Sequence, residues 1–229
     1  MPSIAVLIPA LDEEQAIAQV LAAIPPGLVQ EVVVVDNGST DRTAKVACSL
    51  GARVVSEPRR GYGQACLSGL AALGQVDIVV FLDGDYSDYP EEMPQLLDPI
   101  LKGEADLVIG SRVLGRREPG ALLPQQRLGN ALATWMIRLL FGVRYTDLGP
   151  FRAIRSEALQ RLGMQDRDYG WTVEMQVKAA RLGLRTAEVP VRYRRRVGTS
   201  KISGTLRGTL RAGYKIIATI LRHSWGARR

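Results

Sequence analysis

The stretch Val79-Val80-Phe81-Leu82-Asp83-Gly84-Asp85 joins an uninterrupted apolar run to two carboxylates that lie two positions apart. A short apolar run without alternation predicts a strand that is covered on both faces, which is typical of parallel sheets. In such sheets a ligand binds beyond the carboxyl ends of the strands. The two aspartates therefore fall where a ligand site is expected.

Apolar runs and helical patterns alternate along the first half of the chain. Strands are predicted at 4–8, 32–35, 54–55, 78–82 and 107–109, and helices at about 13–24, 41–50, 63–73 and 91–102. The second of these helices has Ser39 or Thr40 as its expected N-cap and Gly51 just past its end. This order predicts an α/β fold with a mostly parallel sheet flanked by helices.

Polar segments follow three of the other predicted strands. They are residues 9–14 (PALDEE), 36–41 (DNGSTD) and 110–112 (GSR). Asp, Ser and Gly are common turn residues, and for a single loop that interpretation would suffice. Four such loops at one edge of a sheet favour a functional site instead.

Asp83 and Asp85 are the predicted metal ligands. Two carboxylates at a strand end can face one hard cation, and Mg²⁺ or Mn²⁺ held in this way completes its shell with water and substrate phosphates. Such a metal stabilises the charge of a departing nucleoside diphosphate. The sequence has no P-loop motif, and Gly61-Tyr62-Gly63 lacks the third glycine of a dinucleotide fingerprint. We keep Gly61 as a candidate nucleotide contact.

Composition excludes several other kinds of site. The chain has 229 residues, with two cysteines, Cys48 and Cys66, and one histidine, His223. A disulfide scaffold and a four-cysteine zinc site are therefore excluded, and a single histidine near the C-terminus argues against a histidine-based triad. The first apolar run is short, is interrupted by Pro9 and has no basic residue before it, so no secretory signal is expected. The expected location is the cytoplasm, with both thiols reduced.

Charge is distributed unevenly along the chain. Residues 1–188 hold 19 Lys and Arg against 23 Asp and Glu, whereas residues 189–229 hold 11 Lys and Arg and no acidic residue. The segment 204–229 is predicted to be a basic amphipathic tail, with Leu206, Leu210, Ile217 and Leu221 on one face. Such a helix fits peripheral contact with an anionic membrane surface, or else packs on the body of the protein. The same two possibilities apply to the apolar segment 128–143, which is too short to span a bilayer.

Several motifs together resemble a known family. Ile8–Glu14, Val35–Asp41 and Leu82–Asp85 are similar to the corresponding motifs of family 2 glycosyltransferases of GT-A fold. The later stretches resemble the branch of that family that includes the dolichol-phosphate and other polyprenyl-phosphate mannosyltransferases. These stretches are 110–112, 147–152, 189–191 and 196–201. The resemblance covers about residues 1–205.

The resemblance implies roles for individual residues. A nucleotide-sugar-binding half would span 1–112 and an acceptor half 113–203, together forming one GT-A domain over 1–203. The implied donor-binding residues are Pro9, Ala10, Asp12, Glu13, Asp36, Gly38, Ser39, Gly61, Asp83, Gly84, Asp85, Arg196, Ser200 and Lys201, with Asp83 and Asp85 as metal ligands. The implied catalytic residues are Asp85, Arg112, Arg127 and Glu174, the two arginines meeting an acceptor phosphate.

Two positions depart from the family pattern. Ser87 stands where this branch often has glutamine, so a third side-chain metal ligand is not expected. Gly149 stands where serine is commoner, so the acceptor-side loop is expected to differ in shape.

The leading hypothesis is a metal-dependent, inverting glycosyltransferase that moves a sugar from a GDP- or UDP-linked donor to a polyprenyl phosphate. The alternative keeps this donor site but transfers the sugar to a hydroxyl of a soluble sugar or glycan, with Glu174, Asp147 or Asp168 as candidate bases. A nucleic-acid-binding module ranks below both, because aromatic residues make up only 6% of the chain and the acidic loops would repel phosphates.

Overall fold

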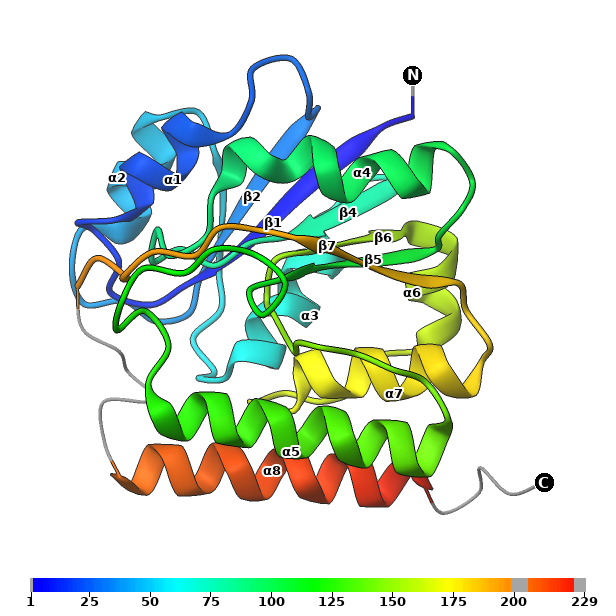
Figure 1. The fold of residues 1–229 in the computed structure, drawn as a ribbon. Coiled ribbons are helices and arrows are strands. Elements are labelled where there is room, and N and C mark those ends of the chain that lie inside the picture. The colour runs from blue at the N-terminus through cyan, green and yellow to red at the C-terminus, as the bar shows by residue number, and fades with distance from the viewer. Residues whose placement is uncertain (1, 199–205, 225–229) are drawn as a thin grey trace.

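The structure is a computed structural model that describes residues 2–198 and 206–224, and for 206–212 only the backbone. The described residues form a seven-stranded sheet with the order β3-β2-β1-β4-β6-β5-β7 (Figure 1). Strand β6 runs antiparallel to its neighbours β4 and β5, and the other pairs are parallel. The strands are β1 (Ile4–Ala10), β2 (Glu31–Asp36), β3 (Arg53–Ser56), β4 (Ile78–Phe81), β5 (Leu107–Ser111), β6 (Arg152–Arg155) and β7 (Thr186–Pro190).

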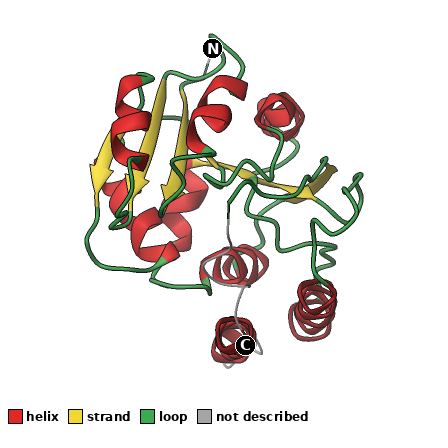
Figure 2. Ribbon diagram, turned by 90° about the vertical axis from the view of Figure 1, so that its left-hand side faces the viewer, coloured by secondary structure: helices red, strands yellow, loops and turns green. Residues whose placement is uncertain are grey.

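Helices cover both faces of this sheet (Figures 1 and 2). One face packs against α1 (Ile17–Ala23), α2 (Thr43–Ser49) and α4 (Met93–Leu101), which follows a short 3₁₀ helix at Pro90–Glu92. The other face packs against α3 (Tyr62–Ala72), α5 (Pro124–Phe141), α6 (Ser156–Leu162), α7 (Trp171–Arg181) and α8 (Leu206–Ser224). The result is the three-layer α/β architecture that the sequence predicts.

The central strands contribute side chains to both layers. In β4, Val79 and Phe81 point into the core that contains Trp171, whereas Val80 and the following Leu82 point into the core beneath α4. All of these side chains are almost fully buried. The continuous apolar pattern of this strand therefore arises because neither face meets water.

Both halves of the chain build the same sheet. All five predicted strands are present, whereas β6 and β7 were not predicted. Strand β6 lies between β4 and β5 and pairs with both, so the second half of the chain enters the middle of a sheet started by the first.

The predicted N-cap of α2 is wrong. The helix begins at Thr43 after Arg42, which makes no side-chain cap hydrogen bond. Thr40 instead donates from its backbone N to Asp12 Oδ1 at 2.7 Å, and Ser39 Oγ accepts a hydrogen bond from Asp12 N at 2.9 Å. These residues tie the loops after β1 and β2 together. The expected helix end at Gly51 is confirmed, because that residue adopts φ +84°.

The apolar segment 128–143 and the basic tail form two adjacent helices, α5 and α8. Helix α8 packs along α5 and α7, with Ile220 buried and Ile216 against the core. The buried face of α8 is therefore turned away from the predicted apolar face, because Leu221 of that predicted face is exposed. The side chains of Leu206, Leu210 and Trp225 lie outside those that the structure describes. Within the described residues, no helix is both long enough and apolar enough to cross a membrane.

Candidate active site

The carboxyl ends of β1, β2 and β4 meet at one edge of the sheet, where they open into a cavity of about 390 Å³, here called the first cavity. The loops after these strands form most of its wall. The N-terminus of α3, the loop before α7 and the segment after β7 complete it. The polar loops that follow β1, β2 and β4, which the sequence analysis identified, therefore lie together at one site.

Asp83 lies at the end of β4 and lines this cavity. Its Oδ1 accepts a hydrogen bond of 3.0 Å from the hydroxyl of Tyr62, the first residue of α3. Burial and the nearby charge of Asp85 raise the pKa of the Asp83 carboxyl to about 7. The buried Asp83 carboxyl is thus also affected by the charge of Asp85.

Asp85 is held in one orientation by its own loop. Its Oδ1 accepts hydrogen bonds from Ser87 Oγ at 2.5 Å and from Ser87 N at 3.0 Å. Between them, Tyr86 adopts φ +59°, a conformation that a bulky residue rarely takes. The position that often carries a glutamine in related sequences therefore orients the second aspartate here.

The pair fits a hard divalent cation. Among residues 2–198 and the described part of α8, no group of three His, Cys, Asp or Glu side chains is arranged to hold a metal. A cation bound by Asp83 and Asp85 would thus take its other ligands from water and substrate. This is the usual coordination of Mg²⁺ on a diphosphate, and it would relieve the repulsion that raises the Asp83 pKa.

The segment after β7 crosses over this metal-binding loop. Arg196 bridges two carboxylates, with Nη2 2.6 Å from Glu13 Oε1 and Nη1 3.4 Å from Asp85 Oδ2. Val197 N donates to the backbone oxygen of Asp85 at 3.0 Å. The guanidinium of Arg194 also stacks on the ring of Tyr86, 3.5 Å from its centroid. Arg196, one of the implied donor-binding residues, therefore lines the first cavity.

A second cavity of about 320 Å³ adjoins the first. Tyr62, Asp83, Asp85, Tyr169 and Arg196 line both cavities. The first turns of α5, the loop 148–150 and one side of α8 also line the second cavity, together with Arg112, Leu122, Thr172 and Tyr193. The two predicted metal ligands thus lie at the junction of two separate ligand-sized spaces.

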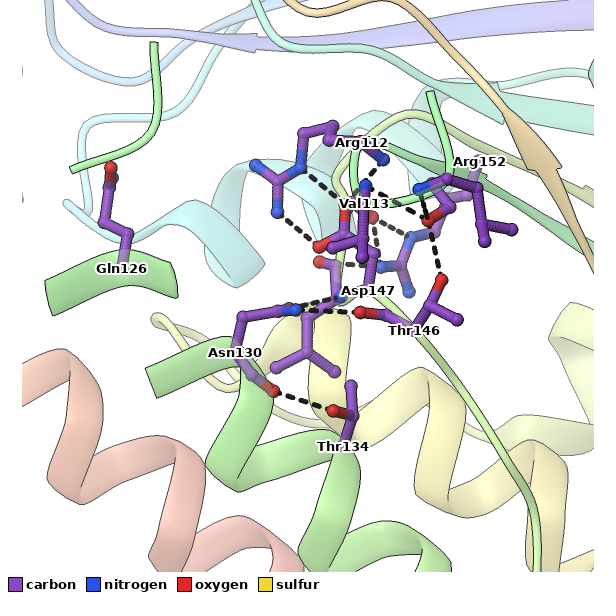
Figure 3. A network of polar contacts seen from close by, with 12 residues as sticks. Arg112, Val113, Gln126, Asn130, Thr134, Thr146, Asp147 and Arg152 are labelled. Carbon is purple, nitrogen blue, oxygen red and sulfur yellow. Dashed lines mark hydrogen bonds and ion pairs between the residues drawn. The ribbon is translucent and has the colours of Figure 1, made fainter. Parts of the chain in front are cut away.

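Arg112 lines the second cavity and is fixed by Asp147 (Figure 3). Its Nε and Nη2 lie 2.7 Å from Asp147 Oδ2 and Oδ1, and its backbone N donates to Oδ2 at 2.8 Å. Burial raises the pKa of the Asp147 carboxyl, but the charge and hydrogen bonds of Arg112 outweigh this, and the net shift is downward. Asp147 is therefore an ionised partner that orients Arg112.

Asn130 on α5 holds the loop that carries Asp147. Its Nδ2 donates to the backbone oxygen of Thr146 at 2.9 Å, and its Oδ1 accepts from Leu148 N at 2.9 Å (Figure 3). Arg152, at the start of β6, is fully buried and donates to backbone oxygens of residues 148, 149 and 172. It stabilises this loop from inside.

Most predicted donor-site residues line the first cavity. They are Pro9, Ala10, Glu13, Gly61, Asp83, Gly84, Asp85 and Arg196. Asp12, Asp36, Gly38 and Ser39 are not among the lining residues. They shape the loops instead: Ser39 N donates to Asp36 Oδ1 at 3.1 Å, and the Gly38 oxygen accepts from Arg60 at 2.8 Å. Ser200 and Lys201 lie outside the described residues.

Several lining residues were not selected from the sequence. They are Leu11, Asn37, Arg60, Tyr62, Ala65 and Tyr169, whereas Asp168, a candidate base in the sequence, also lines this cavity. Asn37 follows β2 directly, so its place at a strand end was a usable signal. Arg60 and Tyr62 flank Gly61 in the Gly-rich loop. Nothing in the sequence around Tyr169 indicates that it lines the cavity, because only tertiary packing brings the 165–170 loop to this edge of the sheet.

Two predicted catalytic residues lie away from both cavities. Arg127 is exposed on α5 and lines neither cavity. Glu174 is 2% exposed within α7, where it accepts hydrogen bonds from the backbone N atoms of Gln165 and Asp166 and pairs with Lys178 Nζ at 2.7 Å. Its contacts are those of a residue that holds the 165–170 loop.

That loop rests on the start of α3. Gln64 N donates to the oxygen of Arg167 at 2.9 Å, and a Cβ at Gly63 would lie 2.0 Å from the oxygen of Asp166. Gly61 and Gly63 are thus required by close backbone contact, which explains the Gly-Tyr-Gly sequence without a dinucleotide. Lys215 of α8 also meets Asp166, with Nζ 3.0 Å from Oδ2.

Comparison with known proteins finds relatives that are named as glycosyltransferases. An uncharacterised glycosyltransferase of Mycobacterium tuberculosis is 42% identical over 211 residues, 91% of this chain and 93% of the relative. A dolichyl-phosphate hexose transferase of Haloferax volcanii is 36% identical over 203 residues, 87% and 86% of the two chains.

Solved structures give the same result. The glucosyl-3-phosphoglycerate synthase of Mycobacterium tuberculosis, in complex with Mn²⁺, uridine-diphosphate-glucose and phosphoglyceric acid, superposes with a TM-score of 0.79 at 31% identity. The match covers 98% of this chain and 80% of that one. The fold is therefore GT-A-like. The family model described as "Glycosyl transferase family 2" matches residues 5–163, so the chain belongs to this family of glycosyltransferases.

Proposed function

We propose that this chain transfers a hexosyl group from a nucleoside-diphosphate sugar to a polyprenyl phosphate, with inversion at the anomeric carbon. One observation carries the proposal: the first and second cavities meet at Asp83 and Asp85. A donor in the first cavity would place its diphosphate beside these carboxylates. An acceptor in the second cavity would then approach the sugar from the side opposite to the leaving group.

The first cavity suits the donor. Mg²⁺ or Mn²⁺ bound by Asp83 and Asp85 would neutralise charge on the diphosphate as it departs. Arg196 is already at this position and can exchange its contact with Asp85 for a phosphate oxygen. As the family resemblance implies, Pro9, Asp12 or Glu13, and Asp36 would contact the base and ribose, with either GDP or UDP as the nucleotide. Of these, Pro9 and Glu13 line the first cavity.

The second cavity suits an acceptor that has an anionic head and an apolar body. Arg112 lies near the metal-binding aspartates, where a guanidinium can bind phosphate oxygens in a fork. Further out, the wall includes Leu122, Leu148, Pro150 and Ile216. Since Ile216 belongs to α8, the proposed acceptor half (113–203) extends into the 204–229 tail.

A phosphate acceptor also explains which carboxylates are missing from this cavity. Among its described lining residues, the only carboxylates are Asp83 and Asp85, which are reserved for the metal. Asp147 is paired with Arg112, Glu174 lies outside, and Asp168, the third candidate base, lines the first cavity only. A sugar hydroxyl would need a base to remove its proton, whereas a phosphate is already ionised at neutral pH.

The reaction then needs little from the protein besides positioning and charge. A phosphate oxygen of the acceptor, oriented by Arg112, attacks C1 of the sugar. The bond from C1 to the donor phosphate breaks, and its electron pair leaves with the nucleoside diphosphate. Arg196 stabilises the charge that develops on this group, and no proton has to be transferred.

A second candidate function is transfer to a hydroxyl of a soluble acceptor. Gln125, Gln126 and Asn130 line the second cavity and offer polar groups to a small ligand. The structural relative with phosphoglyceric acid acts on such a compound, and it also supports this alternative. The dolichyl-phosphate relative supports the lipid acceptor.

Two assays test the proposal. Thermal shift with GDP, UDP, GDP-mannose and UDP-glucose, each with Mn²⁺ or EDTA, would identify the nucleotide by a metal-dependent increase in Tm. Labelled donor is then offered with dolichyl phosphate, undecaprenyl phosphate or phosphoglyceric acid. Transfer to a polyprenyl phosphate is expected, and exclusive transfer to phosphoglyceric acid would establish the second candidate instead.

A further inference from the structure

Helix α5 carries a row of large apolar side chains that face solvent. Leu128 is 72% exposed, Leu132 42%, Trp135 57% and Leu139 67%. Their spacing of four, three and four residues puts them on one side of the helix. The buried residues of α5, Ala133, Thr134 and Ile137, lie on the opposite side. This row therefore contributes nothing to the core of the described protein.

Helix α8 also carries exposed large apolar side chains. It runs beside α5 (Figures 1 and 2), and its Tyr214 and Leu221 are 75% and 45% exposed. Both lie on the side of α8 away from the buried Thr219 and Ile220. We call the exposed residues Leu128, Leu132, Trp135, Leu139, Tyr214 and Leu221 the α5–α8 face. Monomeric proteins rarely leave so many large apolar side chains together in water without a function.

The charged residues of these two helices are all basic. Neither α5 nor α8 contains an acidic residue, and the loops next to α5 contain none from 119 to 146. Exposed Arg127 and Arg138 lie on α5, and exposed Arg222 lies on α8. Leucine, tryptophan and tyrosine bordered by arginine are the chemistry of a surface that rests on anionic lipid headgroups.

The same charges argue against a second copy of the chain as the occupant. A two-fold dimer through this face would bring the same patch of each copy together. Arginines would then meet arginines, with no acidic residue on either helix to pair with them. A bilayer that contains anionic lipid has the complementary charge, and its acyl region accepts the leucines and Trp135.

The position of the face relative to the second cavity supports the same conclusion. Gln125, Gln126 and Gly129, in the first turns of α5, line that cavity, and so do Gly213 and Ile216 of α8. The two helices that carry the α5–α8 face thus also form part of the wall of the second cavity. A molecule held on a membrane by this face would have the cavity close to the lipid surface.

We propose that the α5–α8 face docks the protein on the surface of an anionic bilayer, with α5 lying in the interfacial region. The contact is peripheral and depends on both the apolar row and the arginines. A lipid acceptor would then reach the second cavity directly from the membrane, and this link to catalysis rests on the proposed function. The docking on the membrane does not depend on the proposed function.

The test uses the tryptophan already present in the face. In a full-length chain with Trp225→Phe, Trp135 is the exposed reporter and Trp171, which is 1% exposed, gives a constant background. Vesicles of phosphatidylcholine with phosphatidylglycerol should shift the emission to the blue, and co-sedimentation should give the bound fraction. Vesicles of phosphatidylcholine alone should bind at least fivefold more weakly.

Matched variants separate this face from general stickiness. The double variant Leu128→Glu and Leu139→Glu should lower the partition coefficient at least tenfold. The control Leu50→Glu and Leu101→Glu alters two leucines that are 53% and 52% exposed, one just after α2 and one at the end of α4, and it should bind as the parent does. Far-ultraviolet circular dichroism and Tm establish that both variants fold.

Three results would overturn the proposal. They are the absence of a blue shift, equal losses of binding in the face and control variants, and a parent dimer by light scattering that Leu132→Glu converts to monomer. The assay contains no sugar donor and no acceptor, so its failure leaves the proposed transfer reaction untouched. That reaction is tested separately with a short-chain polyprenyl phosphate in detergent.

Discussion

Arg112 and Asp147 form a bidentate ion pair, in which both side-chain contacts measure 2.7 Å and the carboxylate is 1% exposed. The aspartate is thereby committed to the arginine and unavailable as a base. Arg112 in turn presents a fixed guanidinium to the second cavity. Its orientation follows from the sheet: the loop after β5 and the loop before β6 leave neighbouring strands, which brings positions 112 and 147 together.

Replacing Arg112 by lysine should separate charge from geometry. Arg112→Lys keeps the positive charge but loses the planar fork, so we expect transfer to a phosphate acceptor to fall at least tenfold, mainly through the KM for acceptor. The donor-induced increase in Tm should persist. Arg127→Lys is the matched control on exposed α5 and should be neutral. Equal effects of the two substitutions would remove Arg112 from the acceptor site.

Removing the metal or its main ligand should stop transfer. Asp85→Asn takes away a carboxylate that lines both cavities, and a loss of more than 100-fold is expected, since metal stabilisation of the leaving group contributes several kcal/mol. EDTA should have the same effect on the parent chain, reversed by added Mn²⁺. Full turnover of the metal-free enzyme would refute the role of this pair.

Ser87 provides a finer test of the same site. Its hydroxyl and backbone N both bond to Asp85 Oδ1. Ser87→Ala should raise the Mn²⁺ concentration for half-maximal activity about tenfold, as is typical when a partner that orients a metal ligand is lost. Saturating Mn²⁺ should restore most of the rate. Asp85→Asn should not recover in this way.

The sequence could predict the donor side of the site better than the acceptor side, for a physical reason. Asp83, Asp85 and Glu13 directly follow strands whose apolar runs are unmistakable, and parallel strands bring such ends to one edge. Asn37 has the same signal. The family pattern supplied Arg196, which lies 183 residues from its partner Glu13 and could not be placed by any local rule.

The acceptor side depends on tertiary packing. Strand β6 is four residues long and pairs antiparallel in the centre of the sheet, so nothing in its own sequence indicates where it goes. Arg127 and Arg112 are both arginines near apolar segments, and only the fold separates the exposed one from the one fixed by Asp147. Glu174 similarly looks like a candidate base until its backbone contacts are known.

Glu57 should give the protein a pH-dependent part of its stability. Hydrogen bonds from Ser68, Gln64 and Arg59 lower the pKa of its carboxyl from 4.5 to about 2. Because the folded-state pKa lies below the unfolded one, this stabilisation is fully present above about pH 4.5 and is lost as the pH falls toward 2. Glu57→Gln should therefore lower the urea midpoint at pH 7, and the difference from the parent should shrink steadily in measurements at pH 4 and pH 3. A constant difference would show that the charge of Glu57 is not the cause.

Glu174 is either a catalytic base or a residue that anchors the 165–170 loop, and the variant Glu174→Gln distinguishes these two roles. The carboxylate accepts hydrogen bonds from Gln165 N and Asp166 N at Oε2 and pairs with Lys178 Nζ through Oε1. A glutamine oxygen can accept from both backbone donors, but its NH2 group at the other position cannot accept from Lys178. Losing this largely buried ion pair costs about 1–3 kcal/mol, so a fall in Tm of several degrees is expected. The KM for donor should rise, because the loop that carries Asp168 and Tyr169 into the first cavity is loosened.

The rate constant is the decisive quantity for this variant. If Glu174 anchors the loop, kcat at saturating donor should change less than threefold and the pH profile should keep its shape. A catalytic base would instead cost a factor of 10² to 10⁴ in kcat and remove the acidic limb of the profile. Glu157→Gln, an exposed carboxylate on α6, is the control and should leave both Tm and KM unchanged. A fall in kcat of that size without a change in Tm would return Glu174 to the reacting centre and favour a hydroxyl acceptor.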